Sequence, residues 1–307
     1  TMIVQGAFNL LFRPGLRENF LDTWEGWEPE HPMFLKGGTM DKPEMSATIM
    51  TGPSRLLERG DGEPITFEDA VIGPKVMGVD KEFALGFIIS RRTVEDDQYG
   101  KANQSAKWLA HAAQMTQEYR AAAFLDDAFT GTYFKGIDGL SLCNSAHTLI
   151  GMNAGSTTVA NTPTSQVGLS MTGVTACQDL YGLMKDENGD PIKMWPDKLI
   201  IGNNAGDINR AWQIFNSQKE PFTTANQDNA IKHRMGNITP EVSHYKTSTK
   251  SYFFIDSRYN DAWMLVRRPV EFDDTYDKIV DAAMYFCSTR FMIWFVSWRG
   301  WVGVNPT

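Results

Sequence analysis

The sequence has few cysteines and no closely spaced pair of them. Its 3 cysteines, Cys143, Cys177 and Cys287, form no C-x-x-C motif, which argues against a disulfide framework and against a thiolate zinc site. We expect the three thiols to be reduced and structural. The 5 histidines form no H-x-x-x-H or H-E-x-x-H motif, so no pair of metal ligands is predicted on one helix face.

An excess of positive charge is also absent. The chain has 29 Lys and Arg against 37 Asp and Glu, a net charge of −8, which disfavours tight binding to a nucleic-acid backbone. The most apolar stretch, 291–296, is far below the ~20 residues that cross a bilayer, and residues 1–20 lack a signal-peptide pattern. The sequence therefore predicts a soluble protein that is not secreted.

Motifs of catalysis are missing as well. Residues 139–143 lack the second glycine of a nucleophile elbow. The segment 202–207 lacks the lysine of a phosphate-binding loop, so Asn203 or Asn204 is expected to cap the next helix. Residues 186–190 are predicted to form a hairpin tip rather than a calcium loop. We therefore predict no catalytic, cofactor-binding or metal-binding residues and no bound cofactor.

The composition is that of a folded chain, with 307 residues, 42% of them hydrophobic and 21% charged. This length suits one large domain or two modest ones. Residues 1–38 carry many large apolar side chains between glycines and prolines, and such an arm cannot bury itself. A short helix is predicted from Pro14, with one face formed by Leu16, Phe20, Trp24 and Trp27. This face packs either on its own domain or on a neighbouring subunit.

Residues 40–80 have the pattern of a long two-stranded ribbon. Extended runs are expected at 45–50 and 65–72, and the tip between them at 58–64 is rich in turn-forming and charged residues. A ribbon of this length is marginal by itself. We therefore expect it to lie along its own body or along a neighbouring molecule.

A strand at 82–90 is followed by a long helical region that ends near residue 130. Its buried stripe is predicted to contain apolar or small residues at helical spacing: Trp108, Ala112, Met115, Tyr119 and Ala122. Beyond it the pattern gives an α/β block, with a helix at 165–185, a strand at 198–201 and a helix at 205–216. The C-terminal part, from 251 to 301, is rich in predicted strands.

The order of these elements resembles the major capsid protein of tailed phages over nearly the whole chain. Three stretches are similar to the Mu-like major head subunit branch: FALGFIISRRTVEDDQYG at 83–100, DGLSLCNSAH at 138–147 and VSWRGW at 296–301. The branch more often has Phe and Pro where this chain has Cys143 and Thr148. The resemblance implies an α+β capsid fold with an N-terminal arm, an extended E-loop, a peripheral domain with a long spine helix, and an axial domain.

By this likeness the arm is 1–38, the E-loop 39–81, the peripheral domain 82–147 with 263–307, and the axial domain 148–262. The implied function is structural: the subunits assemble through hexamers and pentamers into an icosahedral head around DNA. The partners would be further copies, a portal, a scaffold and cement proteins, and the location the virion, assembled in the host cytoplasm.

The residues expected at contacts between subunits are apolar in the arm and charged at the ribbon tip: Phe8, Phe12, Phe20, Trp24, Trp27, Arg59, Asp61 and Glu63. The core of the spine helix is expected at Trp108, Met115 and Tyr119. Two other functions stay open. One is an encapsulin-like compartment shell with protein cargo. The other, remote, is a carbohydrate-active enzyme that uses acid clusters such as 95–97 or 273–274.

Overall fold

The computed structural model describes most of the chain: residues 5–53, 55–90, 92–93, 100–150, 157–224, 226–236, 238–277, 279 and 281–306, with side chains from residue 15 onward. The chain forms two compact units. The first unit combines Thr1–Glu44, Val79–Ala121 and Met264–Ile293, and the second combines Met45–Gly78, Ala122–Trp263 and Trp294–Thr307. No helix in the described residues is long and apolar enough to span a membrane.

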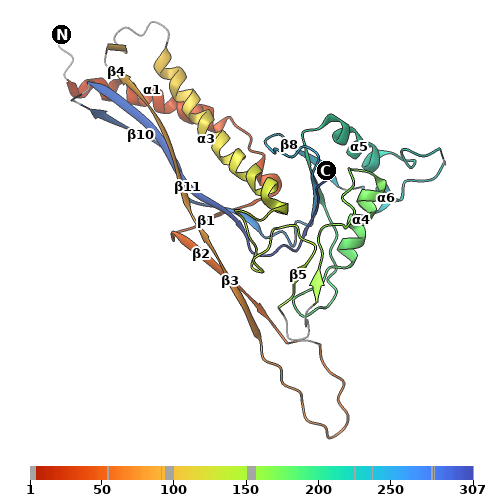
Figure 1. The fold of residues 1–307 in the computed structure, drawn as a ribbon. Coiled ribbons are helices and arrows are strands. Elements are labelled where there is room, and N and C mark those ends of the chain that lie inside the picture. Colours follow the sequence, from red (N-terminus) through yellow and green to blue (C-terminus); the bar gives the residue numbers. More distant parts are fainter. Residues whose placement is uncertain are drawn as a thin grey trace. The chain divides into compact units, whose positions relative to one another are not determined.

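The first unit is built on a four-stranded sheet in the order β1, β10, β11, β4 (Figure 1). The strands are β1 (Lys36–Thr39), β10 (Ala262–Asp277), β11 (Ala282–Phe295) and β4 (Lys81–Ser90). The first two residues of β10 and the last two of β11 belong to the second unit. β4 and β11 are antiparallel, with register from Ala282 opposite Ser90 to Phe291 opposite Lys81. The late strands of the chain thus pair with the strand that the sequence placed at 82–90.

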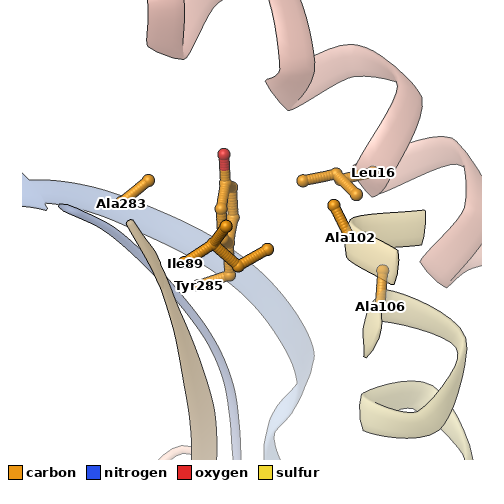
Figure 2. Close-up of a cluster of buried hydrophobic side chains, with 6 residues drawn as sticks. All are labelled: Leu16, Ile89, Ala102, Ala106, Ala283 and Tyr285. Carbon is orange, nitrogen blue, oxygen red and sulfur yellow. The ribbon is translucent and has the colours of Figure 1, made fainter. Parts of the chain in front are cut away.

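Two helices pack on one face of this sheet, α1 (Gln5–Glu25) and α3 (Lys101–Asp126). Figure 2 shows Leu16 of α1 and two alanines of α3 directed at Ile89, Ala283 and Tyr285 of the strands. A second cluster joins Phe20 with residues of α3 and with Cys287. Burial of these apolar side chains holds both helices to the sheet, at ~25 cal/mol per Å² of apolar surface removed from water.

Helix α1 corrects two expectations for the arm. It begins at Gln5, so Pro14 lies inside the helix rather than in its first turn, because residues 5–12 contain good helix formers ahead of the proline. Leu16 and Phe20 are each only 1% exposed within the first unit. Phe20 is therefore a core residue of its own chain, and its assignment to a contact between subunits is wrong.

Helix α3 corrects the predicted core of the spine. The long helix is confirmed, but Trp108 is 65% exposed and Tyr119 is 59% exposed, while Met115 is partly buried. The buried stripe lies on a neighbouring face and consists mainly of small residues: Ala102, Ala106, Leu109, Ala110 and Ala113. Small side chains allow the helix to lie close to the sheet. The size of an apolar side chain on this helix therefore does not predict whether it is buried.

The ribbon is a separate two-stranded sheet of β2 (Glu44–Thr51) and β3 (Val71–Val79). The first strand agrees with the sequence pattern. The second was expected at 65–72 and begins instead at Val71. Residues 68–70 are Glu, Asp and Ala, which are poor strand formers, and no strand of the described residues pairs with 65–70. Residues 52–70 consequently form a long connection with a turn at 61–62.

The second unit is built on the sheet β12, β9, β7, β8. Its strands are β12 (Trp301–Val304), β9 (Tyr252–Ile255), β7 (Lys198–Gly202) and β8 (Thr239–Ser243), and only β7 and β8 are parallel. This unit also contains three helices, α4 (Met171–Gly182), α5 (Ala205–Asn216) and α6 (Ala230–Met235). A short antiparallel pair is formed by β5 (His147–Thr148) and β6 (Thr158–Val159). Asn204 caps α5 by accepting from the Gly206 amide, as the sequence predicted.

The core of the second unit is aromatic and is fixed by a few buried polar groups. All four residues of β9 and all four of β12 are buried. The hydroxyl of Tyr181 on α4 donates to the carbonyls of Phe254 and Gly300, at 2.9 and 3.0 Å. These hydrogen bonds join α4 to two segments that are far apart in sequence. They therefore help to fix the position of the helix on the sheet.

Candidate assembly surfaces

The connection between β2 and β3 exposes an unusual number of large apolar side chains. Leu56 is fully exposed and Phe67 is 90% exposed, with Leu57 and Ile65 each more than half exposed; Met50, near the end of β2, is also more than half exposed. A soluble monomer seldom gathers so many exposed apolar residues on one segment unless another surface covers them. Sequence reasoning missed these residues, although a signal was present: apolar side chains in a glycine- and proline-rich segment that cannot form a core.

Polar contacts within the second unit hold the base of this connection. The Nε of Arg55 donates to Asp190 Oδ1 at 2.7 Å, and the Asn188 side-chain amide donates to the Gly52 carbonyl at 3.2 Å. Both partners lie in the turn at 186–190, where Asp186 Oδ1 accepts from the amides of Asn188 and Asp190. The hairpin tip predicted at 186–190 is present, and it contacts the beginning of the connection between β2 and β3.

The charged tip is exposed and partly folded on itself. The Gly60 amide donates to Glu63 Oε2 at 3.0 Å, and the Glu63 amide donates to the Gly60 carbonyl at 3.3 Å. Arg59 and Asp61 are exposed on either side of Gly60. The three predicted tip residues thus lie together on one turn, with Glu63 already engaged in that turn.

The arm residues divide into three groups. Phe20 is buried. Trp24 and Trp27 are partly buried, with ring centroids 5.7 Å apart, and Trp27 lies 6.3 Å from the His31 ring. Phe8 and Phe12 belong to α1, but their side chains lie outside the described residues. Among the predicted arm residues whose side chains the structure describes, Trp24 and Trp27 keep apolar surface that another molecule can cover.

Further apolar side chains are exposed on the first unit. Trp108 and Tyr119 are exposed on α3, and Leu85 and Ile88 are exposed on opposite faces of β4, which is an edge strand of its sheet. A hollow of about 360 Å³ is lined by Ala112 and Thr116 of α3 and by Leu85 and Cys287 of the strands, among others. Edge strands and apolar hollows are sites where proteins contact one another.

The buried polar residues of the second unit have structural roles. His147 is fully buried; its Nδ1 lies 2.5 Å from Asp138 Oδ2, its Nε2 3.1 Å from Asn161 Oδ1, and its ring stacks on Trp298 at 4.1 Å. The Asn161 amide nitrogen donates to two backbone carbonyls, so its oxygen accepts and His147 Nε2 donates. With both ring nitrogens engaged and no exposed surface, His147 links Asp138 to Asn161.

The cysteines of the second unit are also inert. Cys143 and Cys177 are buried, and burial raises the pKa of the Cys177 thiol to about 12 and raises that of Cys143 as well. Neutral buried thiols are poor nucleophiles and poor metal ligands. Within the described part of the chain, no three His, Cys, Asp or Glu side chains gather into a metal-binding group.

Known structures share this architecture although sequence comparison finds no relative. No protein-family model matches the chain, and no curated protein is similar to it in sequence. The capsid structure of cyanophage P-SCSP1u is 11% identical, covers 89% of this chain and 86% of its own, and gives a TM-score of 0.56. A chain of Microbacterium phage Oxtober96 is 10% identical, covers 92% of both chains, and gives 0.55.

A third structure of this kind comes from an archaeon. The crystal structure of a virus-like particle from Pyrococcus furiosus is 11% identical, covers 94% of this chain and 97% of its own, and gives a TM-score of 0.52. Likeness at such low identity with nearly complete coverage reports the fold. The sheet with its long helix, the two-stranded ribbon and the second α/β unit therefore give this chain the fold of tailed-phage capsid proteins.

Proposed function

We propose that the protein is the major capsid subunit of a tailed phage, which assembles with copies of itself through hexamers and pentamers into an icosahedral head around DNA. The observation that supports this most is the exposed apolar connection between β2 and β3. A fold shared with capsid proteins explains it, because such a segment is covered when neighbouring copies pack together. The function is then interface geometry rather than catalysis.

The four parts expected from the resemblance carry over to this proposal. Residues 1–38 act as the arm, 39–81 as the E-loop, 82–147 with 263–307 as the peripheral domain, and 148–262 as the axial domain. Arg59, Asp61 and Glu63 meet charged groups of a neighbouring copy, and Trp24 and Trp27 meet apolar ones. Each exposed ion pair contributes only ~0–1 kcal/mol, but a closed shell repeats it many times.

The Mu-like branch is the closest assignment that the sequence supports, through the stretches at 83–100, 138–147 and 296–301. A portal, a scaffold and cement proteins would be the other partners, and the virion the final location after assembly in the host cytoplasm. The net charge of −8 suits a shell that encloses DNA without gripping it, because a strongly basic lining would hinder packaging and release.

Light scattering of the purified full-length chain tests this function. We expect particles or capsomers of many subunits for the wild-type chain. A double variant with Leu56→Ser and Phe67→Ser should remain folded but lose these particles, whereas Thr66→Ser in the same connection should keep them. A wild-type chain that stays monomeric at every concentration tested contradicts the proposal.

The second candidate is an encapsulin-like compartment shell. It is kept because the fold also occurs in a particle that is described as virus-like rather than as a phage capsid, the one from Pyrococcus furiosus. Both candidates predict closed shells, so particle size does not distinguish them. The contents of the particles do distinguish them. Nuclease-resistant DNA in particles isolated from their natural host supports the phage head, and a single enriched cargo protein supports the compartment.

A further inference from the structure

A buried lysine closes the connection between β8 and β9, residues 244–251. Lys246 is only 4% exposed. Its Nζ donates to the Ser251 carbonyl and lies 2.8 Å from Ser251 Oγ, and it sits 5.1 Å from the centroid of the Phe253 ring. The side chain therefore links the beginning of the connection to its end.

The closed connection is docked against two other elements of the second unit. The amides of Thr247 and Ser248 donate to the two carboxylate oxygens of Asp126 at the end of α3, at 3.0 and 3.1 Å. The backbone at Thr249 lies so close to Gly202 that a Cβ there would be 2.5 Å from the Thr249 carbonyl oxygen. The connection thus has one tight arrangement, and its opening would release contacts with α3 and β7.

The charges around Lys246 do not neutralise an ammonium group. The titratable groups that influence it from packed elements are Asp126 on α3 and Asp207 on α5. Asp126 already accepts two amides, and Asp207 contacts the Asn204 amide and Arg210. On the connection itself, His244 and Lys250 are exposed. No carboxylate in the described residues forms an ion pair with Nζ.

A neutral amine fits this site better than an ammonium group. Its two N–H groups match two acceptors, the Ser251 carbonyl oxygen and the Ser251 hydroxyl oxygen, whose own proton is donated to the Ser248 carbonyl. A buried cation without a paired carboxylate is costly. Burial lowers the pKa of Lys246 to about 7, and the attraction of Asp126 and Asp207 offsets only part of that effect.

We propose that Lys246 is a proton-controlled lock on the connection 244–251: the neutral amine holds the connection closed, and uptake of a proton favours its opening. The lock belongs to the fold of the second unit and does not depend on the proposed shell function. In the open state the amine is hydrated and regains the usual lysine pKa of 10.5.

The direction of the pH dependence follows from these two values. Between about 7 and 10.5 the open state binds more protons than the closed state, so the closed state gains stability as the pH rises through this window. Below pH 7 both states carry the proton, and the gain is absent. The opening equilibrium should therefore fall about tenfold between pH 6 and pH 8.

Hydrogen–deuterium exchange of the full-length chain, read by mass spectrometry and corrected for intrinsic exchange rates, measures this opening. We expect protection of peptides within 244–255 to rise about tenfold from pH 6 to pH 8, with little change in peptides of α1. Lys246→Met should remove this dependence, and the exposed control Lys250→Met should keep it. Lys246→Gln serves the same purpose if the methionine variant does not fold.

Three results would contradict the proposed role of Lys246. One is protection of 244–255 that is flat between pH 6 and pH 8 in the wild-type chain. The second is an equal change in all peptides, which would report global unfolding linked to other groups. The third is a pH dependence that persists in a folded Lys246 variant. The wild-type profile needs no variant, so the proposal remains testable even if both substitutions prevent folding.

Discussion

Asp127 shows how a single carboxylate organises the chain where α3 ends. It is 5% exposed and accepts from the Thr130 hydroxyl at 2.6 Å and from the amides of Thr132, Tyr133 and Phe134 at 2.8 Å each. Burial alone would raise the pKa of Asp127, but these four hydrogen bonds favour the charged form and hold the pKa below its usual 3.8. The carboxylate thus supplies acceptors for three amides of the irregular segment that follows the helix.

We predict that Asp127→Asn destabilises the chain by about 1–3 kcal/mol at neutral pH, because an amide oxygen replaces only part of the carboxylate's acceptor capacity. The depressed pKa gives stability that is present above pH 3.8 and lost as the pH falls through the lower folded value. Urea unfolding at neutral and acidic pH measures this. The exposed control Asp179→Asn should change little, and an equal loss in both variants would contradict the role.

His147 is the second residue whose environment makes a sharp prediction. His147→Ala leaves the side chain of Asp138, which is 2% exposed, without its partner, and breaking a buried pair of this kind costs about 3–5 kcal/mol. Denaturant melts should show this loss, while His111→Ala on the exposed side of α3 stays near wild type. The Asp138→Asn and His147→Ala effects should be less than additive. Loss of a bound metal in His147→Ala would instead reveal a site that the structure does not show.

Among the elements, α3 shows what a periodic pattern can and cannot decide. The sequence predicts a long helix here, and Lys101–Asp126 confirms it. Two neighbouring stripes repeat at helical spacing, one with Trp108 and Tyr119 and one with alanines, so periodicity alone cannot choose the buried one. The sheet that α3 covers decides, and the sequence does not show that sheet because β4 pairs with β11, far along the chain.

We predict opposite effects for the two stripes. Ala110→Leu on the buried stripe should cost about 1–3 kcal/mol through overpacking and reduce folding yield. Trp108→Ala on the exposed stripe should change subunit stability by at most about 0.5 kcal/mol and reduce particle formation. Thermal melts and sedimentation of the two variants separate the effects. A Trp108→Ala variant that unfolds the subunit would restore the original core assignment.

The ribbon gives the element-scale test of assembly. Its existence and first strand could be predicted, but the start of the second strand could not, because Ile65, Thr66 and Phe67 are good strand formers that pair with no strand of the described residues. Deleting residues 58–63 should leave the melting temperature unchanged, since they are exposed, and impair particle formation. If the deletion unfolds the subunit, the connection belongs to the core and the assembly role is wrong.

At the scale of the whole molecule, the overall class was accessible from the sequence and the division into compact units was not. The order of the three similar stretches indicated a capsid fold, and structural likeness at 10–11% identity shows that fold. Each compact unit is built from three separate segments, because long strands such as β10 and β11 extend from one unit to the other. A prediction that divides the sequence mainly into successive domains does not reproduce such an arrangement. The expected borders at 38, 81 and 147 therefore remain proposals.

Electron cryomicroscopy of the purified full-length chain tests the central claim most directly. Subunits that bury their ribbons and exposed stripes on one another should appear as closed shells, or as tubes and capsomers in which six or five copies surround an axis. The apolar connection 52–70 should be covered by a second copy in the resulting map. A chain that remains a compact monomer, with a radius of gyration near the ~19 Å of a 307-residue globule, would contradict the account.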